Sequence, residues 1–437
     1  ALSAAAAESR SMSQNNGAGG AKGGARSAVH GALRAQGKDI VDAAGQVVVL
    51  KGFGLGGWLV PEGYMLGNPG GKDSPRGIRA AIEAKISVAK ASDFFATYQR
   101  NYVTEADIQA IARWGFNSVR LPLNANSLMP EAGQPKVAPY RYDEAGFKPI
   151  DDLVRWCRAA GLYVILDLHA APGAQSAHNI ADSDGEARLW SEPEVYWPRT
   201  VDLWLELAAR YRAEPLVIGY DLLNEPMLPG AEIGHTSQSN GPWAAHDNRP
   251  LRALYVAITQ ALRAAGDHKI VFPEAGFWAM NFKDLLPPWD DNLVYSFHFY
   301  PPPTGPKFFE SADSTPSFGP IFEANVPLWM GETGEWRQDW IKTRADWLAD
   351  NRRSVEFMAT ANRGHAISWS WWTTKKFGRE TQPWSCQFPA EYSALLEHWD
   401  SASSADAELA LGKFAHALST SECTYHADLV QALGGSP

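Results

Sequence analysis

Residues 163–224 decide the fold, because they contain YVILDLH (163–169), PEVYWPRTVDLWLELAARYR (193–212) and LVIGYDLLN (216–224) in succession. The outer two segments are short apolar runs bounded by turns, which is typical of buried strands. The middle segment has the apolar spacing of an amphipathic helix. A strand, a helix and a second strand in this order predict parallel strands joined by a crossover helix.

The same alternation extends outward from this unit in both directions. Further strands are predicted at VVVLKGF (47–53), FNSVRLPL (116–123), KIVFPE (269–274), LVYSFHFY (293–300), VPLWMGE (326–332) and HAISWSWW (365–372). Eight parallel strands, each followed by a helix, close into a (β/α)8 TIM barrel. We therefore predict an α/β fold with one barrel domain over residues 36–437, which includes loop insertions and an extra C-terminal helix at about 405–418.

The composition excludes several classes of partner. The 437 residues include 39 Lys and Arg against 49 Asp and Glu, a formal net charge of −10. An acidic surface neither neutralises nucleic-acid phosphates nor attracts anionic lipids, so we expect no nucleic-acid partner. No apolar run is long enough to span a bilayer. We also expect a monomer.

The ends of the chain and its cysteines carry weaker signals. Residues 1–35 are rich in Ala, Gly and Ser and have no Phe, Trp or Tyr, so we expect this segment to be mobile. The first ten residues are not an intact signal peptide, but their Ala and Ser content fits a cleaved one, and we expect a secreted or periplasmic protein. Cys386 and Cys423 are candidates for a single disulfide, although the cysteine count favours unpaired thiols.

Polar and ionisable side chains end most of the predicted strands. They are Arg120, His169, Asn224, Glu225, Glu274, His298, Tyr300, Glu332, Trp369 and Trp371. In a barrel of this kind the active site lies at the carboxyl ends of the strands. Glu225 and Glu332 follow different strands, so their carboxyls can face one sugar ring from two sides, as glycoside cleavage requires. For Glu274 we expect a subsite or a buried network instead.

Four strings at the ends of predicted strands resemble glycoside hydrolase family 5, a family of retaining (β/α)8 glycosidases. They are NEP (224–226), FHFYPP (297–302), MGETG (330–334) and SWSWW (368–372), and the resemblance runs from about Val47 to Trp372.

The resemblance implies that Glu225 is the acid/base and Glu332 the nucleophile. It further implies that Arg120 steadies Glu332, that Tyr300 hydrogen-bonds it, that His169 and His298 line the sugar site, and that a tryptophan lies beneath the sugar. Trp369 fits that position best, and Trp371 lies on the same strand face. Asn224 can hydrogen-bond the sugar 2-hydroxyl.

The first strand narrows the substrate. GLGGWLVPE (54–62) and DLHAAPGAQ (167–175) resemble the exo-β-1,3-glucanase branch of the family, which implies that Glu62 binds terminal glucose hydroxyls. The sequence departs from that branch at Pro61, in the long insertion after Glu225 and at WWTTKK (371–376). We predict retaining, exo-acting hydrolysis of β-glucosidic bonds in a β-1,3-glucan, oligosaccharide or glucoside. The alternatives are an endo-acting β-glucanase or β-mannanase, a glycolipid β-glucosidase with an apolar lip at 277–282 and 307–310, and a carbohydrate-binding barrel without catalysis.

We expect neither a cofactor nor a catalytic metal. The chain has no HExxH motif, and the GxGxxG at Gly52, Gly54 and Gly57 is not followed by the helix that a dinucleotide site needs.

The sequence is rich in tryptophan. The 18 Trp residues match the Phe residues in number, and indoles are common on ligand surfaces. We expect Trp278 at the cleft, and about two or three of the loop tryptophans to line it. This loop group consists of Trp58, Trp190, Trp243, Trp278 and Trp336, whereas Trp114, Trp156, Trp204 and Trp347 are expected to pack helices.

Overall fold

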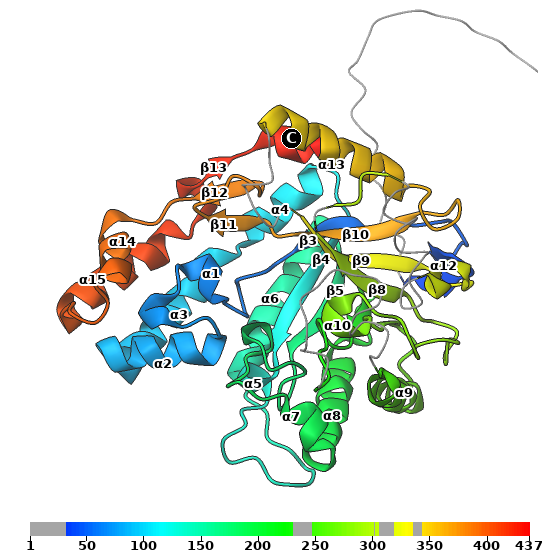
Figure 1. Cartoon of the computed structure of the whole chain (residues 1–437), viewed down its shortest axis with the longest axis horizontal. Coiled ribbons are helices and arrows are strands. Elements are labelled where there is room, and N and C mark those ends of the chain that lie inside the picture. Colours follow the sequence, from blue (N-terminus) through cyan, green and yellow to red (C-terminus); the bar gives the residue numbers. More distant parts are fainter. Residues whose placement is uncertain (1–31, 230–246, 301, 306–318, 335–342) are drawn as a thin grey trace, which may run out of the picture.

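A parallel barrel forms the centre of the computed structural model, which describes residues 32–229, 247–300, 302–305, 319–334 and 343–437 (Figure 1). Its strands are β3 (Lys51–Gly54), β4 (Ser118–Asn124), β5 (Tyr163–Ala170), β6 (Val217–Asp221), β7 (Ile270–Phe272), β8 (Tyr295–Phe299), β9 (Leu328–Thr333) and β10 (Ile367–Trp372). Their order is β7-β6-β5-β4-β3-β10-β9-β8. Parallel bridges from Val271 to Leu293 and from Glu274 to Ser296 join the two end strands. The predicted (β/α)8 barrel is confirmed.

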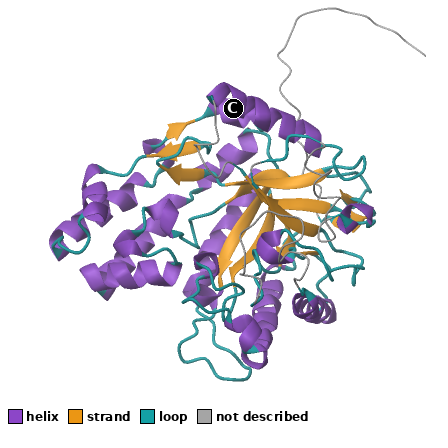
Figure 2. Ribbon diagram, in the orientation of Figure 1, coloured by secondary structure: helices purple, strands orange, loops and turns teal. Residues whose placement is uncertain are grey.

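Helices cover the outside of the barrel (Figure 2). The long ones between barrel strands are α2 (Pro75–Ile86), α3 (Val88–Tyr102), α4 (Glu105–Arg113), α6 (Glu144–Ala160), α8 (Pro193–Tyr211), α9 (Arg249–Ala264) and α13 (Arg344–Met358). Shorter ones are α1 (Gly63–Leu66), α5 (Ala125–Leu128), α7 (Arg188–Ser191), α10 (Gly276–Ala279) and α12 (Pro320–Glu323), with 3-10 turns at Pro69–Gly71, Asn179–Ala181 and Thr420–Glu422. After the barrel come α14 (Ala390–Glu397), α15 (Ser404–Ala417) and α16 (Ala427–Ala432), so the predicted C-terminal helix is α15.

The alternation of side chains along the strands separates two cores. In β4, Val119 and Leu121 join the cluster between barrel and helices, and Arg120 points to the other side of the sheet. Ile165 of β5, Phe272 of β7 and Trp329 of β9 belong to the cluster inside the barrel. The polar side chains that end the strands therefore lie above an apolar plug.

A short hairpin precedes the barrel. Strands β1 (Arg34–Gln36) and β2 (Asp39–Val41) pair in antiparallel fashion, and Leu33 and Ile40 belong to the interior cluster. Arg34 and Ala35 were expected in the mobile segment, but they form part of β1. The burial of Leu33 and Ile40 holds this hairpin against the barrel. Residues 1–31 of that segment lie outside the described part of the chain.

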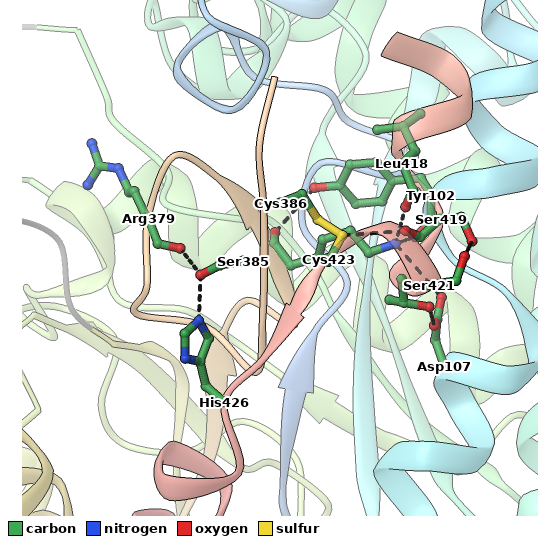
Figure 3. The surroundings of a disulfide bond; sticks show 12 residues. Tyr102, Asp107, Arg379, Ser385, Cys386, Leu418, Ser419, Ser421, Cys423 and His426 are labelled. Atoms are coloured by element: carbon green, nitrogen blue, oxygen red, sulfur yellow. Dashed lines mark hydrogen bonds and ion pairs between the residues drawn. A yellow bond between two sulfur atoms is a disulfide. The ribbon is translucent and has the colours of Figure 1, made fainter. Parts of the chain in front are cut away.

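A small sheet follows the barrel. Strands β11 (Lys375–Phe377) and β12 (Trp384–Cys386) run parallel, and β13 (Thr424–Tyr425) pairs antiparallel with β12. This pairing brings the Cα atoms of Cys386 and Cys423 to 4.3 Å, and the two residues form a disulfide (Figure 3). The expectation of unpaired thiols is therefore wrong. The spacing of the cysteines in the sequence does not show the strand pairing that brings them together. Among the described residues, no helix is long and apolar enough to cross a membrane.

Candidate active site

The carboxyl ends of the barrel strands bring most of the predicted site residues together. Arg120 lies on β4, His169 on β5, His298 on β8 and Glu332 on β9. The other four follow the ends of their strands within four residues, and they are Asn224, Glu225, Glu274 and Tyr300. Arg120 and Glu274 are fully buried, and Glu225 remains partly exposed. The cluster therefore has a dry base and an open upper edge.

Arg120 is the hub of the buried base. Its Nε donates to Asp221 (2.8 Å), one terminal nitrogen donates to Glu332 (2.7 Å), and the other donates to Asn224 (2.7 Å) and Glu274 (3.0 Å). Burial disfavours the cation, but the surrounding carboxylates raise the pKa of Arg120 well above its usual range. The guanidinium stays charged, and its fork geometry fixes the positions of Glu332 and Asn224.

The environment of Glu332 keeps its carboxyl ionised. One oxygen accepts the hydrogen bond from Arg120, and the other accepts one from the Tyr300 hydroxyl at 2.8 Å. Burial opposes the charge, but His298, Arg120 and His169 lower the pKa of Glu332, and the Tyr300 hydrogen bond acts in the same direction. A nucleophilic carboxylate needs this ionised state.

The environment of Glu225 favours the opposite state. Burial raises the pKa of this carboxyl, and the negative charges of Glu332 and Glu274 raise it further, although the hydrogen bond with His298 lowers it. The backbone at Glu225 has φ 44°, an uncommon conformation for a residue other than glycine, and its N–H donates to Glu274 at 2.7 Å. A raised pKa is what a carboxylic acid needs in order to donate a proton.

His298 connects the two carboxyls. Its Nδ1 lies 2.8 Å from Glu225 and 3.7 Å from Glu332, and its Nε2 lies 3.0 Å from Glu274. Burial alone lowers the pKa of an imidazole, but Glu274 and Glu332 raise the pKa of His298 well above its usual range. A charged His298 donates to Glu225 and faces Glu274, so Glu274 has the network role expected of it.

One oxygen of Glu225, one oxygen of Glu332 and a ring nitrogen of His298 lie within 4.8 Å of one another. In the described part of the chain, this is the one cluster with the spacing of a metal site. However, Arg120 already donates to Glu332, and both nitrogens of His298 already face carboxylates, which leaves little capacity for an ion. The close pair of carboxyls suits proton transfer and attack on a sugar instead.

His169 lies against an aromatic surface that the sequence did not assign. Its Nδ1 is 2.7 Å from Asp167, and its ring stacks on Trp372 with centroids 5.4 Å apart and planes at 4°. The Trp372 indole N–H donates to the Tyr64 hydroxyl at 3.0 Å. The aromatic surface of the last strand at this site is therefore Trp372.

Trp369 and Trp371 are not at the site, which corrects the prediction. Both are 1% exposed, and they pack in the layer between barrel and helices, Trp369 against Phe116 and Trp371 against Trp347. The alternation along β10 places Trp372 on the other face. The signal was present in SWSWW, because two small serines precede Trp372 on the inward face.

Glu62 closes one side of the site. It is 5% exposed, and burial raises its pKa to about 7, although nearby His169 acts in the opposite direction. Glu332 raises this pKa and Lys376 lowers it, so both charges act on Glu62. Glu62, Tyr64, Trp372 and Lys376 together are called the sugar wall below.

The loop tryptophans differ in burial. Trp58 is buried, and its indole N–H donates to the carbonyl oxygen of Gln99 at 2.8 Å, so it packs the fold. Trp278 is partly exposed and contacts His178 with ring centroids 4.6 Å apart. Trp190 donates to the carbonyl oxygen of Gln175 at 2.9 Å. Trp243 and Trp336 lie outside the described residues.

Residues 277–282 were considered as one half of an apolar lip for a glycolipid. Phe277 and Phe282 are buried, at 6% and 2% exposed, whereas Trp278 and Met280 are partly exposed. Residues 307–310, the other half of that lip, lie outside the described residues.

Comparison with known proteins assigns the family. Residues 81–378, well over half of the chain, match the model of the family described as cellulase, glycosyl hydrolase family 5. The chain therefore belongs to glycosyl hydrolase family 5. This membership makes it a glycoside hydrolase that acts on β-glycosidic bonds.

Curated relatives carry several activities in their names. A "Beta-xylosidase" of Phanerodontia chrysosporium is 28% identical over 79% of this chain and 71% of its own length. A "Probable glucan 1,3-beta-glucosidase A" of Aspergillus clavatus is 33% identical over 46% of this chain, and the alignment spans 47% of that protein. The structure of a rutinosidase from Aspergillus niger aligns with a TM-score of 0.58 at 16% identity, over 76% of this chain and 92% of that one, which is a likeness of fold.

Proposed function

We propose that the protein hydrolyses β-glucosidic bonds with retention of anomeric configuration. Glu332 attacks the anomeric carbon while Glu225 gives its proton to the departing glycosidic oxygen, and a glycosyl ester forms. Glu225 then takes a proton from water, the resulting hydroxyl attacks the anomeric carbon, and the ester bond to Glu332 breaks. The observation that carries the proposal is that one oxygen of Glu225 lies within 4.8 Å of one oxygen of Glu332, together with the opposite pKa shifts of the two carboxyls. Retaining pairs are about 5–5.5 Å apart, and inverting pairs about 6.5–9.5 Å.

We further propose exo action on a β-1,3-glucan, oligosaccharide or glucoside. The sugar wall supports this, because Glu62 is buried beside Glu332 and, with a pKa of about 7, can both donate and accept hydrogen bonds to terminal hydroxyls near neutral pH. The name of the Aspergillus clavatus relative supports the same substrate class. The β-xylosidase relative favours a second candidate, exo cleavage of β-xylosides.

Product analysis tests both proposals. The protein is incubated with β-1,3-gluco-oligosaccharides and with aryl β-glucosides and β-xylosides, and early products are separated by chromatography. From an oligosaccharide of n glucose units, exo cleavage is expected to give glucose and the oligosaccharide of n − 1 units as the early products, in equal amounts. Early products of intermediate length would contradict exo action, and faster release from the xyloside would favour the second candidate. Proton NMR is expected to show the β-anomer first, whereas the α-anomer would contradict retention.

The disulfide is informative about the cellular compartment in which the protein works. We propose that the protein works in an oxidising compartment outside the cytoplasm, and the bond between Cys386 and Cys423 supports this, since such bonds persist mainly in secreted and periplasmic proteins. Fractionation of the producing cells is expected to find the activity outside the cytoplasm, and cytoplasmic activity would contradict the proposal.

A further inference from the structure

Lys375, the first residue of β11, places its ammonium group in the protein interior, away from solvent. Its side chain is buried, and its Nζ donates to the backbone carbonyl oxygens of Tyr102 and Leu418, both at 2.6 Å. Oδ2 of Asp107 lies 4.0 Å away. Figure 3 shows Tyr102, Leu418 and Asp107 grouped near the disulfide. The ammonium therefore joins three segments that are far apart in the sequence.

Two helix ends make this position favourable for a cation. Tyr102 is the last residue of α3, and Leu418 is the C-cap of α15. The final carbonyls of a helix have no partner within it and carry the negative end of its dipole, which favours a positive charge there. Burial lowers the pKa of Lys375 to about 8, and Asp107 opposes that change. The side chain thus satisfies carbonyls that the helices leave open.

The segment that carries Lys375 also carries part of the sugar wall. Trp372 lies three residues earlier and stacks on His169. Between Trp372 and Lys375, Thr373 accepts a hydrogen bond from the Gly56 N–H at 3.0 Å, which ties the segment to the barrel. Lys376, the residue after Lys375, lies over the Tyr64 ring at 5.4 Å. Because successive residues of a strand point to opposite sides, Lys375 anchors the side facing away from Lys376.

We propose that Lys375 is a positioning residue for the glycosidase reaction. Its ammonium fixes residues 372–376 to the ends of α3 and α15, and this holds Trp372 and Lys376 in place at the sugar wall. The inference rests on the proposed function. On that function the sugar wall binds the sugar without touching the bonds that break, so loss of the anchor is expected to weaken substrate binding more than it slows the chemical step.

A pair of lysine variants tests this role. Lys38 is the control, because its Nζ also donates to two backbone carbonyl oxygens, those of Phe322 and Ala324, both at 2.7 Å. Lys38 is more exposed than Lys375, and its hydrogen bonds go to no residue of the sugar wall. Lys375→Met is expected to raise KM for 4-nitrophenyl β-glucoside about tenfold with kcat nearly unchanged, because a lost contact that binds substrate and transition state equally raises KM alone. Lys38→Met is expected to lower Tm and leave KM unchanged.

The readouts separate positioning from stability. A purely structural role lowers Tm and the titrated fraction of active enzyme but does not move KM, so equal KM values in both variants would overturn the proposal. If Lys375→Met fails to fold, Lys375→Gln keeps one donor group and is expected to show a smaller rise in KM, and an unchanged KM there is equally decisive. A wild-type protein inactive on every β-glycoside would refute the proposed function itself.

Discussion

At the residue scale, the pKa values of two glutamate side chains shift in opposite directions because their surroundings differ. Glu332 receives hydrogen bonds from Arg120 and Tyr300, which favour its charge, whereas burial and neighbouring carboxylates favour the proton on Glu225. On the proposed mechanism, activity falls at acid pH when Glu332 gains a proton, and at alkaline pH when Glu225 loses one.

The Tyr300 hydroxyl gives a direct test of this division. Tyr300→Phe removes a hydrogen bond that lowers the pKa of Glu332, so that pKa rises and the acid limb of the kcat/KM profile moves to higher pH. A hydrogen bond to a charged group contributes about 1.5–3 kcal/mol, so kcat/KM is expected to fall by about 10- to 100-fold. Tyr295→Phe, which removes a hydroxyl bonded to the Leu285 carbonyl, is the control. An unshifted acid limb in Tyr300→Phe would contradict the assignment.

The sequence predicts which residues reach the site better than it predicts how they are connected there. Glu225 and Glu332 interrupt apolar runs at positions where a barrel places its site, so topology alone indicates that they converge. Asp167 and Asp221 also contact Arg120, but nothing in their spacing shows that one guanidinium joins them.

At the element scale, the alternation along β10 determines which tryptophan faces the site. Three indoles lie within four residues, and a shift of one position moves a side chain to the opposite face. The sequence predicts the strand correctly over 365–372, but the resemblance to the family placed the wrong indole at the site. The register of β10 with β3 and β9 establishes the face on which each indole lies.

Truncation of each tryptophan separates binding from packing. Trp372→Ala is expected to raise KM strongly while the protein stays folded, because the indole stacks on His169 at the sugar wall. Trp369→Ala leaves a cavity between barrel and helices and is expected to lower the free energy of unfolding by about 3–5 kcal/mol with little change in KM. Steady-state kinetics and denaturant unfolding measure the two effects. The reverse pattern would show that Trp369 is the sugar platform.

At the scale of the whole molecule, the barrel is predictable and its C-terminal addition is not. Eight apolar runs with helices between them leave few topologies, whereas the short strands β11, β12 and β13 have no clear periodic pattern. Their pairing depends on contacts between distant segments, among them the disulfide and the lysine held by α3 and α15. Figure 1 shows this small sheet beside the barrel, near α4.

Removal of the disulfide tests how much this addition stabilises the fold. The double variant Cys386→Ala and Cys423→Ala opens a loop with a sequence separation of 37 residues. Its free energy of unfolding is expected to fall by about 2–4 kcal/mol in denaturant titrations without reductant. Reductant is expected to destabilise the wild type and leave the variant unchanged. Equal unfolding midpoints for both proteins would contradict a stabilising role.

The central claim is that Glu332 attacks the sugar and Glu225 transfers the proton. Kinetics of Glu332→Ala with an aryl β-glucoside, in the absence and presence of azide, test it most directly. We predict that turnover is lost without azide, because no carboxylate remains to attack, and that azide partly restores aglycone release. NMR is then expected to identify an α-glucosyl azide, formed by a single inverting attack. Undiminished turnover by Glu332→Ala, or a β-configured azide product, would contradict the account.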